Sequence, residues 1–397
     1  MNSIDRAWSL CCGGLLIGAL ALLTIGVSSG SDSAVLKGSV TDSAGHPLAG
    51  IHVRISGDGV GSAASRSGPD GTYRFPGLRP FARYRIAAGM AGYRTVEYDG
   101  MELEAGRTRV IDFRLRRPGE REIVVLASRD PFPYVDLVRA FSHGLTVPTR
   151  VIDLDAENDP IETVRRVAAE RPDLILGAGL RAARLVRSYV RDVPAILTLL
   201  TEPRHFDLGA PNICFVVSNP DARALLRRLT ALLPAARRVG VIYQADDSSL
   251  LARDLREAAG AAGLTVELAP CRDAREVQDR LRRLEGRVDS LVVPFDRLTE
   301  APGALDLING WALRNRIPTA APDPEWVRHG ALFTYAVPAD RIGEEASRIA
   351  RQIIYGARHP SEFDLHTPEN PVLAVNRETA ESLGVTIPDA LGVEVAY

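Results

Sequence analysis

The sequence predicts a small all-β sandwich followed by a larger α/β domain of two lobes. Between residues 36 and 116, short runs of alternating apolar and polar residues are separated by turn signals. After a charged linker at 117–121, strand-like and helix-like patterns alternate strictly, and they do so in two successive sets. We therefore expect a signal peptide or N-terminal anchor at 1–33, the sandwich at 34–116, the linker at 117–121 and the two-lobed domain at 122–397.

Length and charge narrow the class of protein. The chain has 397 residues, more than one ordinary domain holds, and 46% of them are hydrophobic, which is enough for several cores. The net charge of -2 gives no basic surface for nucleic acid, so no nucleic-acid partner is expected. The 7 histidines show no i, i+4 pairing and no cysteine companions, so we expect neither a metal site nor a cofactor.

The N-terminus carries an export signal. Leu10 to Val27 is apolar or small throughout, follows a segment that holds Arg6, and is succeeded by a run of small polar residues. A signal peptide cleaved near Ser29 or Ser33 fits this pattern and is favoured, while an uncleaved anchor also fits. We therefore expect a periplasmic or extracytoplasmic protein, with membrane contact only through residues 10–27 if they are retained.

Two cysteines follow this segment, Cys214 and Cys271. An oxidising compartment permits a disulfide, but two cysteines alone do not show one. Two small buried hydrophobic residues are the favoured interpretation.

The sandwich is predicted from six short runs with turns between them. The expected strands are Leu36 to Thr41, Ile51 to Ile55, Thr72 to Phe75, Tyr84 to Ala88, Tyr93 to Tyr98 and Arg109 to Leu115. A turn is also expected at Asp58 to Gly61. In the pair Asp70-Gly71, glycine accepts the positive φ that a tight hairpin turn requires.

These residues resemble the carboxypeptidase regulatory-like, transthyretin-like module. The resemblance is carried by Gly38, Val40, Asp42, Gly45, Pro47, Leu48, Gly50, Asp70, Gly71, Tyr73, Phe75, Leu78, Tyr84, Gly92 and Tyr93. It implies a spacer or interaction domain of an exported protein and no chemistry of its own.

In the main domain, the stretch from Arg238 to Ala269 has the clearest pattern. It indicates a strand, a polar loop, an amphipathic helix and a second strand, which is a right-handed βαβ unit. We expect Leu251, Leu255, Ala258 and Ala262 on the buried helix face. Ligands bind at the carboxyl ends of such strands, so the loop that includes Gln244, Asp246, Asp247, Ser248 and Ser249 is the first candidate site.

The other expected elements repeat this alternation. Helices are expected at Val135 to His143, Pro160 to Glu170, Leu180 to Tyr189, Ala339 to Tyr355 and Glu378 to Leu383; strands are expected at Ile123 to Leu126, Arg150 to Leu154, Leu174 to Leu176, Ala195 to Leu199, Ile213 to Val217, Ser290 to Val293, Pro318 to Thr319, Leu332 to Tyr335 and Val372 to Val375. The helix from Ala339 carries an apolar stripe at Ile342, Ala346, Ile349 and Ile353, and Gly356 is expected as its C-cap glycine.

This half of the chain resembles the solute-binding proteins of ABC transporters, in the branch whose members bind aromatic amino acids such as tryptophan. The segments that carry the resemblance are Leu232 to Tyr243, Val288 to Asp296, Ile317 to Val337 and Thr367 to Pro388. It implies the type I periplasmic-binding fold, in which two α/β lobes enclose a ligand. It also implies a non-enzymatic extracytoplasmic protein that captures a small solute, amino-acid-like in that branch, and delivers it to a membrane permease.

The same resemblance and the strand-end loops locate a cleft between the lobes. Backbone N–H groups after Gly177-Ala178-Gly179, or the hydroxyls of Ser248 and Ser249, would hold a carboxylate. Asp296, or Asp323, would hold an ammonium group. Phe132, Tyr134, Phe295 and Trp326 would form an apolar wall. The predicted ligand-binding residues are Tyr134, Gly177, Ala178, Gly179, Thr201, Glu202, Gln244, Ser248, Ser249, Phe295, Asp296 and Asp323.

Several of these loops depart from the pattern usual in the family. Arg297 stands where asparagine is usual, Phe295 replaces a small polar residue, and Tyr243-Gln244-Ala245 replaces Tyr-Asn-Pro. The departures concern ligand specificity and leave the fold prediction unchanged.

Three features of the sequence allow other interpretations. Gly177, Gly179 and Ala182 satisfy the dinucleotide fingerprint in form, but on the third βα unit, where close helix packing explains them better. For each candidate carboxylate, helix capping or loop solvation is the structural alternative. The alternative function keeps the fold and replaces transport by ligand sensing or by contact with another envelope protein through the sandwich.

Overall fold

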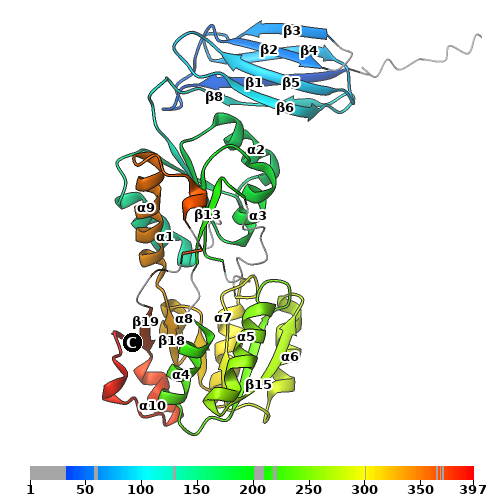
Figure 1. The fold of residues 1–397 in the computed structure, drawn as a ribbon. Coiled ribbons are helices and arrows are strands. Elements are labelled where there is room, and N and C mark those ends of the chain that lie inside the picture. Colours follow the sequence, from blue (N-terminus) through cyan, green and yellow to red (C-terminus); the bar gives the residue numbers. More distant parts are fainter. Residues whose placement is uncertain are drawn as a thin grey trace, which may run out of the picture.

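The structure is a computed structural model that describes residues 33–57, 61–127, 131–200, 210–217, 221–299, 301–363, 365–366, 368 and 371–397. In Figure 1 the β-sandwich lies at the top, the first α/β lobe in the middle and the second α/β lobe at the bottom. Among the described residues, none of the helices has the length and apolar character to cross a membrane. The expected signal peptide or anchor lies outside them.

The sandwich consists of two sheets. One has the strand order β4-β1-β7, with β8 also paired to β1, and the other has the order β3-β2-β5-β6. The strands are β1 (Ala34–Thr41), β2 (His52–Gly57), β3 (Gly61–Arg66), β4 (Thr72–Leu78), β5 (Arg83–Gly89), β6 (Val96–Glu102), β7 (Thr108–Val110) and β8 (Phe113–Arg114). Buried side chains such as Ile55, Ile86 and Phe113 fill the space between the sheets.

In the sandwich, Gly71 has the predicted turn conformation, while strand β3 was not predicted. Gly71 has φ of 77°, and a Cβ there would lie 2.6 Å from the carbonyl oxygen of Val40, so only glycine fits. Strand β3 begins at Gly61, the last residue of an expected turn. Its sequence of small serine and alanine residues has no apolar alternation, which is why the pattern did not predict it.

Lobe 1 is a parallel sheet in the order β10-β9-β11-β12-β13 with helices on both faces. Its elements are β9 (Ile123–Ala127), α1 (Pro131–His143), β10 (Thr149–Asp153), α2 (Pro160–Glu170), β11 (Leu174–Ala178), α3 (Leu180–Tyr189), β12 (Ala195–Thr198), β13 (Ile213–Val216) and α9 (Ala339–Ile354). Helix α9 comes between strands of lobe 2 in sequence but lies against α1 (Figure 1). Its stripe of Ile342, Ala346, Ile349 and Ile353 is buried in the lobe 1 core, as predicted.

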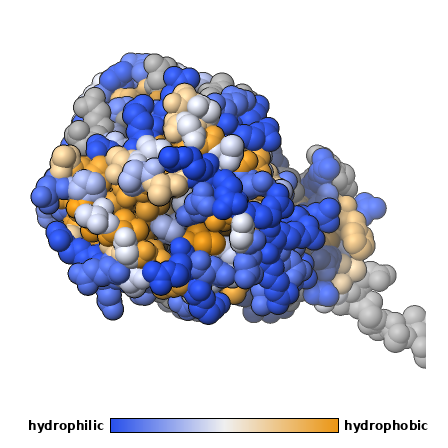
Figure 2. Space-filling view, turned by 90° about the horizontal axis from the view of Figure 1, so that it is seen from below, coloured by the Kyte–Doolittle hydropathy of each residue, from blue (hydrophilic) through white to orange (hydrophobic). Residues whose placement is uncertain are grey.

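Lobe 2 holds a second sheet in the order β15-β14-β16-β17-β18-β19-β20, parallel except where β18 and β19 pair. Its elements are α4 (Ala222–Leu232), β14 (Arg238–Gln244), α5 (Ser249–Ala259), β15 (Thr265–Cys271), α6 (Val277–Leu284), β16 (Ser290–Val292), α7 (Ala304–Arg314), β17 (Thr319–Ala321), α8 (Pro324–Arg328), β18 (Phe333–Ala336), β19 (Val372–Val375), α10 (Arg377–Leu383) and β20 (Val395–Ala396). Figure 2 looks at the lower end of this lobe, where apolar residues lie between hydrophilic ones.

One local prediction about a helix was correct in part and another was wrong. On α5 and just after it, Leu255 is buried and Leu251, Ala258 and Ala262 are half buried against the core as predicted, but Ala252 and Ala259 are buried as well, so the centre of the buried face is rotated by about one position. Helix α9 does not end in a left-handed glycine, because the residue with positive φ near its end is Ala357 (φ 50°).

The cysteines confirm the favoured interpretation. Cys214 lies in β13 of lobe 1 and Cys271 in β15 of lobe 2, and both are buried and free. Burial raises the pKa of each thiol to about 12, which keeps them protonated and unreactive.

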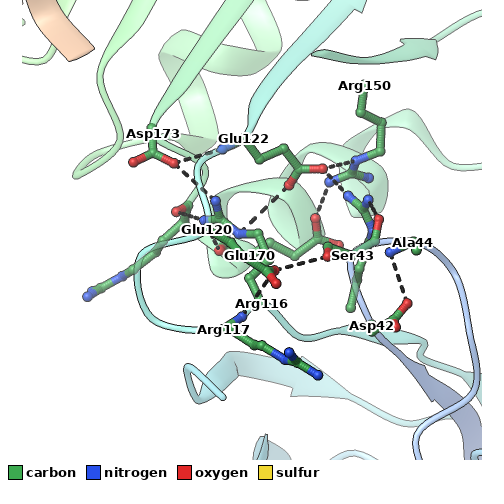
Figure 3. A network of polar contacts seen from close by, with 12 residues as sticks. Asp42, Ser43, Ala44, Arg116, Arg117, Glu120, Glu122, Arg150, Glu170 and Asp173 are labelled. Carbon is green, nitrogen blue, oxygen red and sulfur yellow. Dashed lines mark hydrogen bonds and ion pairs between the residues drawn. The ribbon is translucent and has the colours of Figure 1, made fainter. Parts of the chain in front are cut away.

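A buried network of charges fixes the sandwich to lobe 1 (Figure 3). Glu122, the residue directly after the linker, accepts hydrogen bonds from Arg114 of the sandwich and from Arg150 of lobe 1. Arg116 donates to Asp173 at 3.1 Å and to the backbone carbonyl of Glu170 at 3.2 Å. Glu122 and Arg116 are buried and their partners are partly buried, so the pairing sets their mutual orientation and holds the two domains in one arrangement.

Candidate functional site in the cleft between the lobes

A cavity of about 800 Å³ opens between lobe 1 and lobe 2. Lobe 1 contributes Tyr134 from α1 and the first turns of α3, and lobe 2 contributes the loop after β16 and helix α8. These segments follow the carboxyl ends of parallel strands, where open α/β sheets bind ligands. The residues on which the site depends are Tyr134, Leu180, Arg184, Arg297, Leu305 and Trp326.

The turn before α3 is closed by a tyrosine. Gly179 has φ of 87° and is the N-cap of α3, and a Cβ there would lie 2.2 Å from Tyr134 Oη. Tyr134 itself is buried and lines the cavity. Gly177 and Ala178 end strand β11, so the predicted turn and helix start are present, with Leu180 as the first residue of the helix to reach the cavity.

Gln244 and Ser248 organise the loop after β14. The Oε1 atom of Gln244 accepts the backbone N–H groups of Asp246 at 2.7 Å and Asp247 at 2.8 Å, and its Nε2 donates to the carbonyl of Arg272 at 3.0 Å. Ser248 Oγ donates to Asp296 Oδ2 at 2.9 Å. Both side chains are therefore used inside lobe 2.

Asp296 is buried and accepts three hydrogen bonds from its own lobe. Its Oδ2 accepts the N–H of Gln244 at 2.8 Å as well as the Ser248 hydroxyl, and its Oδ1 accepts the N–H of Leu298 at 2.9 Å. Burial raises the pKa of Asp296 to about 6, and the three hydrogen bonds offset part of that rise. The carboxylate fixes the loop after β16 to the loop after β14.

Asp323 is the N-cap of α8. Its Oδ1 accepts the backbone N–H groups of Glu325 at 2.8 Å and Trp326 at 3.2 Å. Burial raises the pKa of Asp323 to about 7. The side chain positions the start of the helix that carries Trp326 into the cavity.

The remaining predicted residues fall in different places. Phe295 is half buried and packs against the core of lobe 1, so it joins the lobes directly. Ser249 begins α5 and is half buried. Thr201, Glu202 and the side chain of Phe132 lie outside the described residues. The binding roles of all these residues stay predictions.

Three charged side chains, Asp247, Arg297 and Arg184, form a cluster across the cleft that the sequence did not predict. Asp247 is almost fully buried and takes a two-pronged ion pair from Arg297, with Nε to Oδ2 at 2.7 Å and Nη2 to Oδ1 at 2.8 Å. Arg184 approaches the same carboxylate from lobe 1, with its Nη2 3.6 Å from Oδ1. Asp247 and Arg297 were already visible as a polar loop and a departure from the family pattern, but no sequence signal joined them to Arg184.

Comparison with protein families decides what this two-lobed domain is. The family described as ABC transporter substrate binding protein matches residues 154–396. The chain belongs to this family. Its sandwich matches the carboxypeptidase regulatory-like domain over residues 35–116. Both resemblances predicted from the sequence are thereby confirmed.

Individual relatives agree with this assignment. A tyrosine-binding protein of Clostridioides difficile (strain R20291) is 23% identical over 241 residues, which cover 58% of this chain and 69% of the relative. A domain from Streptococcus pneumonia solved in complex with L-Trp superposes with a TM-score of 0.62 at 19% identity, covering 70% of this chain and 100% of that one. The ligand-free, open structure of a substrate-binding protein with adhesive properties from Clostridium difficile superposes with a TM-score of 0.55 at 20% identity, covering 70% of this chain and 99% of that one.

The fold is therefore the two-lobed type I periplasmic-binding fold, preceded by a small all-β sandwich. Members of this family are extracytoplasmic proteins that bind solutes and work with ABC permeases. Among the described residues no cluster of His, Cys, Asp and Glu side chains has the arrangement of a metal site.

Proposed function

We propose that this substrate-binding protein captures a small solute in the cavity between its lobes and presents it to a membrane permease. The cavity carries the proposal, because its wall is drawn from both lobes. A ligand that touches both lobes stabilises the form in which they are closed, in proportion to its additional contacts. The relatives that bind tyrosine and L-Trp favour a solute of amino-acid size and shape.

In this proposal the protein is exported, acts in the periplasm or its equivalent, and catalyses no reaction. The apolar stretch at 10–27 supports export by a signal peptide. The sandwich serves as a rigid mount for lobe 1, which is supported by the buried charges around Glu122. Lobe 2 is then the part that moves toward the permease or away from it.

The test is a thermal-shift screen of the purified protein against amino acids, organic acids, nucleosides, sugars and small peptides. A ligand present at a hundred times its dissociation constant should add about 2.7 kcal/mol of stability, which moves the melting temperature by a few degrees. Trp326→Ala should abolish that shift, because it removes one wall of the cavity. If no small molecule shifts the melting temperature, the proposed function fails.

A further inference from the structure

The acidic side chains that line the cavity in the described part of the chain are already engaged. Asp155 pairs with Arg181. Asp159 accepts the N–H of Glu162 at 3.0 Å as the N-cap of α2, and Glu325 pairs with Arg328 at 2.8 Å. The two carboxylates behind the wall, Asp296 and Asp323, hold backbone N–H groups of their own lobe. Each of these carboxylates therefore already contacts a donor group of its own lobe, and none of them points to a role in binding a ligand ammonium.

Two guanidinium groups from opposite lobes meet in the same cavity around one carboxylate. Arg297 of lobe 2 uses its Nε and Nη2 on Asp247, whose side chain is 3% exposed. Arg184 of lobe 1 is 52% exposed, and its ion pair with Asp247 at 3.6 Å is too long for a hydrogen bond. Asp246 lies 3.8 Å from Arg297 but is 79% exposed, so water screens it.

The two guanidinium groups carry more N–H donors than the Asp247 carboxylate can accept. A guanidinium has five N–H donors. No described residue accepts a hydrogen bond from Arg184, and Asp247 is the described acceptor for the side chain of Arg297. A second carboxylate placed between the two arginines would satisfy both and would join lobe 1 to lobe 2.

The rest of the wall is apolar. Trp326 is buried at the cavity edge, and Leu180 and Leu305 line it from opposite lobes. Large apolar side chains with a few convergent polar groups are typical of sites that enclose an organic ligand. A ligand body of aromatic size would contact these side chains while its carboxylate reaches the arginines.

We propose that the cleft selects aromatic carboxylic acids by their carboxylate, held between Arg184 and Arg297, and that an α-ammonium group is not required. This inference rests on the proposed function and narrows it. Amino acids then bind only as one kind of carboxylate, and their deaminated analogues bind at least as well. The ammonium role assigned to Asp296 and Asp323 from the sequence is replaced by an internal one.

The experiment is isothermal titration calorimetry of the purified protein with matched probes. L-tryptophan carries both groups, indole-3-propionate lacks the ammonium, and tryptamine lacks the carboxylate. We expect indole-3-propionate to bind at least as tightly as L-tryptophan and tryptamine not to bind. The inference is overturned if L-tryptophan binds about tenfold or more tightly than indole-3-propionate, a difference of about 1.4 kcal/mol, or if tryptamine binds.

A variant pair ties the result to the residues. Arg184→Gln should weaken indole-3-propionate binding by about tenfold or more, because it removes one of two charge-assisted contacts. Arg191→Gln is the control and should bind like the wild type, because Arg191 lies two residues beyond the end of α3 and among the described residues its side chain is hydrogen-bonded only to backbone carbonyls. Unchanged affinity in Arg184→Gln overturns the inference.

Failure of the inference is distinguishable from failure of the proposed function. If none of the three probes binds but another solute in the thermal-shift screen does, the solute-binding function stands and the carboxylate selection is wrong. If neither set contains a ligand, both fail.

Discussion

Arg184 of lobe 1 and Asp247 of lobe 2 form an ion pair across the cleft, with 3.6 Å between Nη2 and Oδ1. Asp247 is held rigidly by Arg297, so the pair joins a fixed group in one lobe to a half-exposed side chain in the other. The contact is weak by itself, since exposed pairs contribute little. Because it spans the two lobes, we expect it to favour the form in which the proposed cleft is closed.

Removal of the Asp247 charge should therefore affect both stability and lobe closure. Asp247→Asn leaves Arg297 without its carboxylate, and we expect a loss of about 1–2 kcal/mol, discounted because Arg297 is partly exposed. Urea unfolding measures this loss, and small-angle scattering should show a larger radius of gyration. Asp246→Asn is the matched control, because that side chain is 79% exposed. Equal effects of the two substitutions would contradict the prediction.

Gly179 should tolerate no side chain. Gly179→Ala places a Cβ 2.2 Å from Tyr134 Oη at a positive φ, and we expect destabilisation by about 2–3 kcal/mol with displacement of Tyr134 from the cavity wall. Chemical denaturation and the near-ultraviolet circular dichroism of the tyrosines measure the two effects. Gly260→Ala is the control, because Gly260 has φ of -57° and no atom within 4 Å of a built Cβ, so it should be neutral or slightly stabilising. A neutral Gly179→Ala would show that the turn can relax.

The fold could be predicted because its signals are local. The bounds of α2 and α3 were predicted correctly, since Asp159-Pro160 gives α2 a capped start and the apolar positions of both helices repeat with the helical period. Strand β3 could not be predicted, because its small residues carry no pattern and its pairing with β2 comes from the sandwich.

The site could be predicted only in part, for a geometric reason. Strand-end loops identify the cleft, and Tyr134 lies on its wall as expected. Whether a loop carboxylate faces the cleft or its own backbone depends on side-chain direction, which no spacing specifies, and Asp323 is such a case. The pairing of Arg184 with Asp247 depends on how the lobes approach each other, so it has no local signal at all.

Asp323 should make the protein less stable as pH rises through the weakly acidic range. Burial raises its pKa from 3.8 to about 7, so between these values the folded protein binds a proton that the unfolded chain releases. The stability contributed by the neutral acid is present below about pH 4 and is lost as pH rises toward 7, on the order of 2–4 kcal/mol. Oδ1 holds the helix N-terminus, so the proton can reside on Oδ2.

Asp323→Asn keeps the capping oxygen and stays neutral, so the fall in urea stability between pH 4 and 8 should flatten. The control is Asp70→Asn. The pKa of Asp70 is lowered by hydrogen bonds from the backbone N–H of Thr72 and from the Thr72 hydroxyl. The stabilising effect of the Asp70 carboxylate is therefore lost only at pH values below the usual pKa of an aspartate, outside the range of pH 4 to 8. An unchanged profile in Asp323→Asn would mean that the buried carboxyl is ionised throughout.

Glu122 should determine whether the sandwich moves with lobe 1. It joins Arg114 to Arg150, so Glu122→Gln removes the charge that both arginines face; Arg150 keeps its pair with Glu170, while Arg114 loses its carboxylate partner among the described residues. We expect the domains to separate while each stays folded, which exposes the linker to proteases. The measurement is the rate of tryptic cleavage after Arg121, which should rise several-fold. Glu104→Gln breaks only an exposed pair with Arg107 and should leave that rate unchanged. If Glu122→Gln is cleaved at the wild-type rate, the contacts of Arg116 with Asp173 and the backbone are sufficient to keep the sandwich attached to lobe 1. The double variant Glu122→Gln, Asp173→Asn then tests whether charge pairing attaches the sandwich at all.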